Sequence, residues 1–146
     1  MKRLLCALLS LSMLFALGTM AVAAGDEAIT EASVSFVTPR GVLYDQNVSV
    51  SGEFVSNNFT TGNTSQDGNS IRYWFKNEGS ENCKVELYKK GTFGSSLVSS
   101  MTVSPSASGG KYTVYKASSR TTYYLKVTST YGGAVKGHLR ANQIDA

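Results

Sequence analysis

Apolar and polar residues alternate with a period of two along most of this chain beyond its first two dozen residues. Residues 48–54, 71–76 and 83–88 each place apolar side chains at every second position. This spacing is typical of a β-strand that buries one face. No stretch of ten or more residues shows the three-and-four spacing of an amphipathic helix, so the sequence predicts an all-β chain.

The alternating segments predict about eight short strands joined by turns rich in Gly, Ser and Asn. The predicted strands span residues 32–36, 48–54, 71–76, 83–88, 97–103, 111–115, 122–127 and 134–141. Pro39-Arg40-Gly41 is interpreted as a turn and residues 56–70 as a long polar loop. Because each strand has one polar and one apolar face, we expect an antiparallel, two-sheet β-sandwich resembling a jelly roll.

The first 24 residues have the three parts of a secretory signal peptide. Lys2 and Arg3 precede an apolar run over residues 4–17, and small residues at Val22 and Ala24 predict cleavage before Gly25. The apolar run is too short to span a bilayer. We therefore expect a secreted, extracellular protein with no membrane insertion after cleavage. The signal peptide resembles those of bacteria, so we expect a bacterial source.

Removing residues 1–24 from the 146 leaves 122, a length that suits one domain spanning residues 25–146. Cys6 would leave with the signal peptide, so Cys83 would have no intramolecular disulfide partner. Cys83 shares a strand face with Val85 and Leu87, which predicts a buried thiol in a monomer. The alternative is an exposed thiol that forms an intermolecular disulfide.

Charge is unevenly divided along the predicted domain. Residues 25–81 hold eight acidic and three basic residues, whereas residues 82–146 hold nine basic and two acidic ones. One interpretation is a dipolar surface that binds an anionic polymer; the other is a mixed surface, because the two halves of a sandwich interleave. No strand carries a basic cluster interleaved with aromatic residues, so we expect no nucleic-acid binding.

The chain offers little for catalysis or metal binding. His138 is the only histidine, no G-x-S-x-G motif occurs, and no pair of carboxylates stands out. Residues 63–69 faintly resemble a calcium loop, but Asp67 is their only carboxylate, and Trp74 stands where a bidentate glutamate would be needed. We predict a protein that is not an enzyme, with no catalytic residue, metal or cofactor.

Aromatic residues on strand faces are the strongest candidates for binding. The alternation places Arg72, Trp74 and Lys76 on the outer face of one predicted strand, and Tyr115 and Tyr124 on the outer faces of two others. Exposed rings on a sheet can stack against sugars, while flanking polar groups supply hydrogen bonds. The alternative is that a loop covers this strand and leaves Trp74 half-buried.

Residues 71–144 resemble the bacterial pre-peptidase C-terminal type of β-sandwich. The segments that carry the resemblance are Tyr73-Trp74-Phe75, then Val85-Glu86-Leu87-Tyr88, then residues 122–127 and a last strand. The resemblance implies a non-catalytic jelly roll that accompanies exported proteins and contacts surfaces or polymers. Asn82-Cys83-Lys84 replaces the acidic residues that often precede the second segment, so no binding residue is transferred from the family.

These observations lead to one preferred function and one alternative. The preferred function is a secreted, non-catalytic binding or adhesion module for an extracellular polysaccharide. Its candidate residues are Arg72, Trp74, Lys76, Tyr115 and Tyr124. The alternative is a structural or protein-interaction role, such as an envelope component or secreted inhibitor that binds a surface protein through exposed edge strands or the 56–70 loop.

Overall fold

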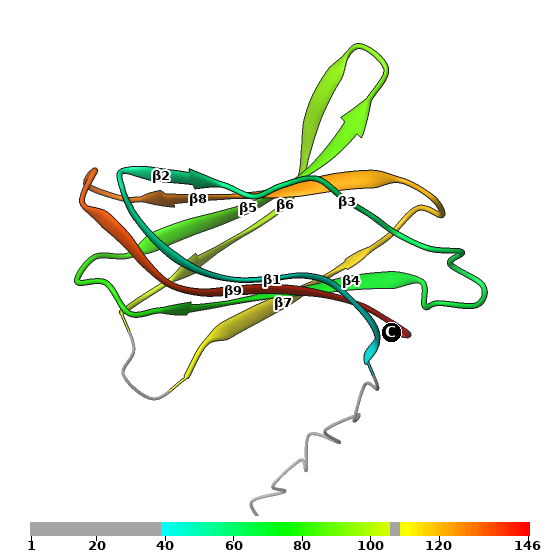
Figure 1. Cartoon of the computed structure of the whole chain (residues 1–146), viewed down its shortest axis with the longest axis horizontal. Helices are drawn as coiled ribbons and strands as arrows, with labels where there is room; N and C mark the ends of the chain where they lie inside the picture. Colours follow the sequence, from blue (N-terminus) through cyan, green and yellow to red (C-terminus); the bar gives the residue numbers. More distant parts are fainter. Residues whose placement is uncertain (1–38, 106–108) are drawn as a thin grey trace, which may run out of the picture. The chain divides into compact units, whose positions relative to one another are not determined.

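Two antiparallel sheets face each other in the computed structural model, which describes residues 39–105 and 109–146 (Figure 1). One sheet has the strand order β1-β9-β4-β7; the other has the order β2-β8-β5-β6, with β3 paired to β8. The strands in these described residues are β1 (Pro39–Ser51), β2 (Glu53–Val55), β3 (Phe59–Thr60), β4 (Ser70–Asn77), β5 (Cys83–Gly91), β6 (Gly94–Val103), β7 (Lys111–Lys116), β8 (Thr122–Ser129) and β9 (Ala134–Ile144). The expected all-β sandwich is confirmed.

The core lies between the sheets and is built by the alternation of the strands. Ile71, Tyr73 and Phe75 of β4 are fully buried, as are their counterparts on β5, β8 and β9. The inward set of β5 is Cys83, Val85 and Leu87, as predicted. Burying one face of every central strand removes a large apolar area from water, and this burial is the main stabilising contribution to such a fold.

Cys83 is a buried free thiol, which confirms the prediction for its environment. Burial raises the pKa of the thiol, and the nearby Glu81 carboxylate raises it further. A buried thiol with a raised pKa is poorly reactive, because the thiolate is the nucleophilic form.

The first described strand differs from the prediction at both ends. Pro39-Arg40-Gly41 is the start of β1 and pairs with the end of β9, so its interpretation as a turn is wrong. Gly and Pro are tolerated there because β1 is an edge strand with register shifts between residues 39 and 44. At the other end, the single strand expected over residues 48–54 is divided at Gly52, whose φ of +79° lets the chain pass from one sheet to the other.

The segment 56–70, which was expected to be a loop, contains the short strand β3 and is hydrogen-bonded to β9. Phe59 of β3 packs into the core, although most of the surrounding residues are polar. Buried Gln143 of β9 accepts a hydrogen bond from Gly62 N (2.8 Å) and donates one to Gly68 O (2.7 Å). A short polar segment can therefore be ordered by one buried amide, which alternation alone does not reveal.

The β5–β6 hairpin extends beyond the sheet to which it belongs. Gly91 pairs with Gly94, so Thr92 and Phe93 form a two-residue turn at the end of a ladder longer than predicted. The ladder shifts register between Leu87 and Tyr88, and such bulges bend and twist a strand. In Figure 1 this hairpin, drawn in light green, rises above the sheet that contains β8 and β5.

The predicted signal peptide at residues 1–24 and the predicted strand at 32–36 lie outside the described residues. Within residues 39–105 and 109–146, no helix is long and apolar enough to cross a membrane.

Candidate functional site

A shallow pocket of about 440 Å³ lies on the outer face of the β1-β9-β4-β7 sheet. Three neighbouring strands supply its lining, because side chains at alternate positions of paired strands project from the same face. The residues that line it are Arg72, Trp74, Tyr112, His138, Arg140 and Asn142, and we call this site the outer-face pocket.

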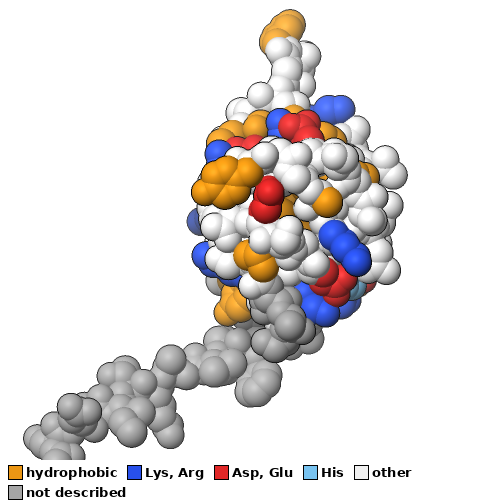
Figure 2. Space-filling model, turned by 90° about the vertical axis from the view of Figure 1, so that its left-hand side faces the viewer, with side chains coloured by type: hydrophobic (Ala, Val, Ile, Leu, Met, Phe, Trp, Pro, Cys, Tyr) orange, Lys and Arg blue, Asp and Glu red, His pale blue; other side chains and the backbone are white. Residues whose placement is uncertain are grey.

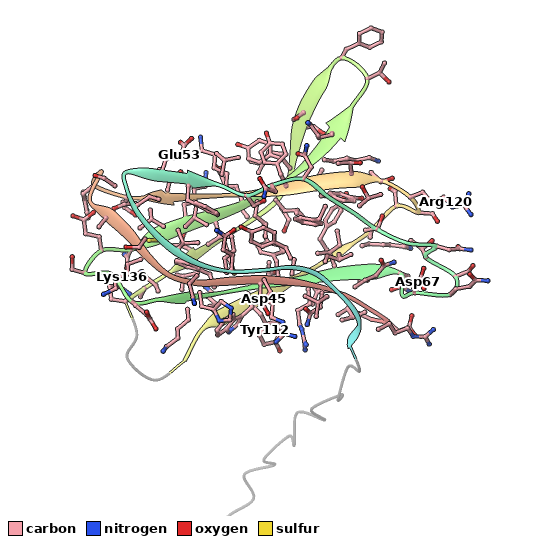
Figure 3. The ribbon with its side chains drawn as sticks, in the orientation of Figure 1. Asp45, Glu53, Asp67, Tyr112, Arg120 and Lys136 are labelled. Atoms are coloured by element: carbon pink, nitrogen blue, oxygen red, sulfur yellow. The ribbon has the colours of Figure 1, made fainter. Side chains whose placement is uncertain are left out.

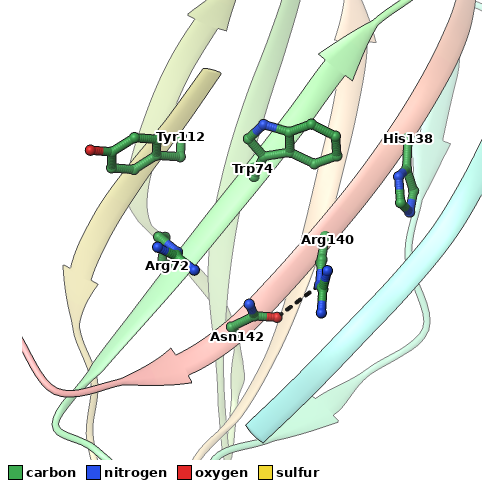
Figure 4. Close-up of a pocket in the computed structure, with 6 residues that line it drawn as sticks. All are labelled: Arg72, Trp74, Tyr112, His138, Arg140 and Asn142. Carbon is green, nitrogen blue, oxygen red and sulfur yellow. Dashed lines mark hydrogen bonds between the residues drawn. The ribbon is translucent and has the colours of Figure 1, made fainter. Parts of the chain in front are cut away.

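Three rings cross the pocket side by side (Figure 4). Trp74 of β4 lies directly opposite Tyr112 of β7 in the strand register. On the other side, the imidazole of His138 meets the Trp74 ring edge-on, with 5.3 Å between ring centroids and an interplanar angle of 90°. Tyr112 is 62% exposed, so the aromatic row offers ring surface to a ligand.

Polar side chains form a second row beside the rings (Figure 4). Arg140 Nε donates a hydrogen bond to Asn142 Oδ1 (3.2 Å), and the guanidinium of Arg72 lies 6.0 Å from the centroid of the Tyr112 ring. At the margin, Asp45 of β1 pairs with His138 and lies 3.5 Å from Arg140 Nε. Asp45 therefore offsets part of the positive charge of β9.

Arg72 keeps its hydrogen-bonding capacity for a ligand. Within the described residues, its side chain makes no hydrogen bond and no ion pair, and its contact with Tyr112 is through the ring. A guanidinium group has five N–H donors and binds carboxylates or sulfates in a two-pronged geometry. The outer-face pocket therefore combines stacking surfaces with a free cationic donor.

The indole of Trp74 lies close to the backbone of Gly110. Gly110, just before β7, lies so close that a Cβ at that position would be 2.1 Å from Trp74 Nε1. The ring is half-buried, which is the burial that the alternative interpretation predicted for Trp74. A ring that lies against backbone in this way has less freedom to move and is preorganised for stacking.

Of the predicted site residues, Arg72 and Trp74 lie in the outer-face pocket, and Lys76 lies just beyond it. Lys76 projects from the same face of β4, next to His138 in the register, and its ammonium pairs with Glu78 at 2.8 Å. This lysine, together with Lys136 and His138, lowers the pKa of Glu78; the Lys76 hydrogen bond is the largest cause.

Tyr115 does not project outward, so its predicted orientation is wrong. It lies opposite buried Ile71 in the register and packs against the core, with its ring edge-on to buried Tyr123 at 6.2 Å. This burial raises the pKa of the Tyr115 hydroxyl. Its partner along the strand, Tyr112, is the ring that faces outward.

Tyr124 faces outward but from the other sheet. Its ring stacks on Tyr88 of β5, with centroids 5.0 Å apart and planes within 3° of parallel. Figure 3 shows the separation of the two outer faces, because Asp45 and Tyr112 lie on one side of the sandwich and Glu53 on the opposite side. Tyr124 therefore cannot share a ligand contact with Trp74.

Four residues of the outer-face pocket were not among the predicted binding residues: Tyr112, His138, Arg140 and Asn142. His138 is a half-exposed residue of β9. His138, Arg140 and Asn142 stand at alternate positions of β9, and this spacing does predict that they lie on one face of the sheet. Their proximity to Trp74 depends on β9 pairing with β4, and the sequence alone does not show that pairing.

Within residues 39–105 and 109–146, ion pairs join the acidic half of the chain to the basic half. Lys126 pairs with Glu53 at 2.7 Å, and Arg40 pairs with Asp145, so ion pairs join the acidic half to the basic half. Figure 2 shows basic and acidic side chains next to one another on the face in view. The interleaved arrangement of the two halves therefore mixes their charges.

The described residues that line the outer-face pocket offer aromatic rings, two guanidinium groups, an imidazole and an amide. No serine, threonine or cysteine is among them, and the hydroxyl in this lining is the phenol of Tyr112. No group of three metal-binding side chains occurs in the part of the chain that the structure describes. In the calcium-like loop, Asp67 Oδ2 accepts a hydrogen bond from Asn63 N (2.7 Å) and thereby closes the turn.

No protein-family model and no curated protein matches this sequence. A solved structure of infectious bursal disease virus, Gt strain, is similar over 75% of this chain, at 10% sequence identity and a TM-score of 0.36. The matched region spans 34% of the viral chain, about a third of its length.

Proposed function

We propose that this protein is a non-catalytic module that binds an extracellular polysaccharide in the outer-face pocket. The observation that carries the proposal is the side-by-side placement of Trp74 and Tyr112 on neighbouring strands. Beside them lies the guanidinium of Arg72, which makes no hydrogen bond or ion pair with any described residue. Secretion, a bacterial source and kinship with the pre-peptidase C-terminal domains belong to the same proposal and rest on the sequence patterns.

Stacking on the two rings would supply most of the binding energy. A sugar ring presents C–H groups on one face, and these groups pack against the faces of Trp and Tyr side chains. Each well-packed ring contributes about 1–3 kcal/mol if the scale measured for nucleic bases applies to sugars. Two such rings on rigid strands give a binding site that needs little reorganisation.

The cationic side of the pocket favours sugars that carry a carboxylate or a sulfate. Arg72 and Arg140 both line the pocket, and Asp45 at its margin contacts Arg140 but not Arg72. Arg72 is therefore the residue we assign to an acidic substituent.

Retention of the mature protein on insoluble polysaccharides and purified cell walls tests the proposal. The test variants are Trp74→Ala and Tyr112→Ala, and the matched control is Tyr131→Ala. Tyr131 lies in the β8–β9 turn outside the pocket and is 81% exposed, so its loss removes an aromatic side chain without touching the site. Circular dichroism verifies that each variant is folded.

The proposal predicts that both pocket variants lose retention by about tenfold or more, while Tyr131→Ala binds like the wild type. Arg72→Gln should weaken retention on acidic polymers and leave any retention on neutral ones unchanged. Undiminished retention of folded Trp74→Ala would show that the ligand binds elsewhere.

A protein partner is the second candidate, and the edge of β7 favours it. β7 ends the β1-β9-β4-β7 sheet, and Tyr112 and Val114 on it are 62% and 40% exposed. An extended peptide could add as a further strand along this edge. Binding of such a peptide would persist in Trp74→Ala and would be lost in Val114→Pro. Binding of a sugar would instead be lost in Trp74→Ala.

A further inference from the structure

We infer that the β5–β6 hairpin is a docking element for membranes rich in anionic lipids. Phe93 stands in the two-residue turn at the tip of this hairpin and is fully exposed. Figure 2 shows the hairpin as a column that extends beyond the body of the sandwich and ends in a hydrophobic side chain. An exposed ring on a projection has no partner within the described residues and can reach into a planar surface.

Basic residues gather at the base of the hairpin. Lys89, Lys90 and Arg120 line a pocket of about 650 Å³ between the hairpin and the β7–β8 turn, and none of the described residues that line it is acidic. Thr121 and Thr122 add hydroxyl groups to the same pocket. Lys90 also lines the adjoining pocket, where the single carboxylate, Glu53, is already paired with Lys126.

The cationic groups remain available to an external anion. Lys89 Nζ makes one neutral contact, a hydrogen bond to Ser118 Oγ of 3.2 Å. The side chains of Lys90 and Arg120 make no hydrogen bond or ion pair within the described residues. The pocket at the base of the hairpin therefore carries a net positive charge, which no carboxylate among its described lining residues offsets.

The spacing between the tip and the base lets the lysine side chains reach the headgroup layer. Phe93 is four positions after Lys89 and three after Lys90, which corresponds to at most about 13 Å and about 10 Å along an extended strand. The headgroup layer is about 5 to 8 Å thick on each side of the hydrocarbon core. With Phe93 at the acyl boundary, the long lysine side chains reach the headgroup phosphates.

An exposed ring at the tip of the hairpin, together with basic residues at its foot, favours a lipid surface over a soluble anion as the ligand. A free phosphate or a soluble acidic polymer would use the cations and leave Phe93 without a role. Anionic lipids engage both features, because each basic residue near such a surface contributes electrostatic attraction while the ring leaves water. Docking would be peripheral, with no segment that crosses the bilayer.

Vesicle co-sedimentation with the folded protein tests this inference. The probes are vesicles that mix phosphatidylglycerol with phosphatidylcholine, and vesicles of phosphatidylcholine alone. The test variants are Phe93→Ala and the double variant Lys89→Gln/Lys90→Gln. The matched controls are Tyr131→Ala, which removes another exposed ring, and Lys116→Gln/Lys136→Gln, which removes two exposed lysines from the other sheet.

We expect binding to the phosphatidylglycerol vesicles only, weakened about tenfold by Phe93→Ala and about 25-fold by the double lysine variant. Both controls, and also Trp74→Ala, should bind vesicles like the wild type, so failure here is separable from failure of sugar binding. No preference for anionic vesicles would overturn the inference. So would unchanged binding by Phe93→Ala, which would show that the basic residues alone bind the vesicles and that the tip of the hairpin has no part in docking.

Discussion

Asn77, the last residue of β4, joins three segments through one buried amide. Its Nδ2 donates hydrogen bonds to Glu81 O (2.7 Å) and Val103 O (3.1 Å), and its Oδ1 accepts one from Gly79 N (3.0 Å). The side chain is fully buried, so water cannot replace these bonds if the amide is removed.

Asn77→Ala is therefore expected to lower the free energy of unfolding by about 2 to 3 kcal/mol, because it leaves a buried carbonyl without a donor. Urea unfolding followed by circular dichroism measures the change. Exposed Asn57 is the matched control, and its alanine variant should stay within about 0.5 kcal/mol of the wild type. A loss of similar size in both variants would show that the buried bonds are not decisive.

At the scale of single residues, the sequence predicted the orientation of β4 but not that of β7. β4 alternates Ile, Tyr and Phe with Arg, Trp and Lys, so one face is plainly more apolar. β7 reads Lys-Tyr-Thr-Val-Tyr-Lys and offers a tyrosine to each face. Only pairing with β4 decides that Tyr112 joins Trp74 and that Tyr115 packs against the core.

Gly137 permits the close pairing of β9 with β4 that builds the outer-face pocket. Its φ is +157°, and a Cβ there would lie 1.9 Å from the backbone oxygen of Lys76. Backbone cannot move aside as a flexible side chain can. Gly137→Ala should therefore destabilise the protein by roughly 3 kcal/mol.

Thermal unfolding of Gly137→Ala, compared with Gly41→Ala, measures this effect. Gly41 also lies within a strand, but a Cβ there would meet nothing within 4 Å. We expect a clear fall in the melting temperature for the first variant and almost none for the second. Equal melting temperatures would contradict a close approach at Gly137.

Glu81 ties the β4–β5 connection to the β8–β9 turn. Its Oε2 accepts hydrogen bonds from the Ser129 hydroxyl and from Gly133 N (3.2 Å). The Ser129 bond is the main cause that holds the pKa of Glu81 below its ordinary value of 4.5, and burial opposes it. A lowered pKa means that the ionised form stabilises the folded state more than the protonated form does.

This contribution is present above pH 4.5 and is lost as the pH falls through the lowered pKa. Glu81→Gln should therefore lie below the wild type in urea midpoint at pH 7, and the gap should narrow by pH 3. Urea titrations of both proteins at the two pH values measure the gap. A gap of constant size would show that the carboxylate charge has no part in the turn.

At the scale of elements, the alternation of apolar and polar residues predicted the central strands. It missed the strand segments that form only because they pair or pack with another strand. β4, β5, β8 and β9 were expected close to their observed positions, because each buries one apolar face. The start of β1 contains Pro and Gly and is held by pairing with β9. β3 is only two residues long and exists because Phe59 packs into the core beside β8.

At the scale of the whole sandwich, the outer-face pocket and the hairpin point in different directions. Figure 3 places Tyr112 on the side of the β1-β9-β4-β7 sheet, whereas the hairpin rises from the side of the other sheet. A protein docked through Phe93 would therefore present the outer-face pocket away from the membrane. The order of strands within each sheet creates this arrangement, and no local sequence pattern encodes it.

If both proposals hold, protein already bound to phosphatidylglycerol vesicles should bind soluble acidic oligosaccharide as tightly as free protein does. The two sites share no residue, and additivity is expected for separated sites. Equilibrium dialysis with and without vesicles measures the two dissociation constants. A dissociation constant raised tenfold by the vesicles would contradict the opposed orientation of the sites.

Fluorescence titration of Trp74 tests sugar binding most directly, because it is the only tryptophan in the chain. The titrant is a soluble acidic oligosaccharide, and the comparison variants are Tyr112→Ala and Tyr131→Ala. We predict a saturable change in Trp74 emission, with a dissociation constant raised about tenfold or more in Tyr112→Ala and unchanged in Tyr131→Ala. Emission that stays constant while the same protein is retained on the polysaccharide would contradict binding in the outer-face pocket.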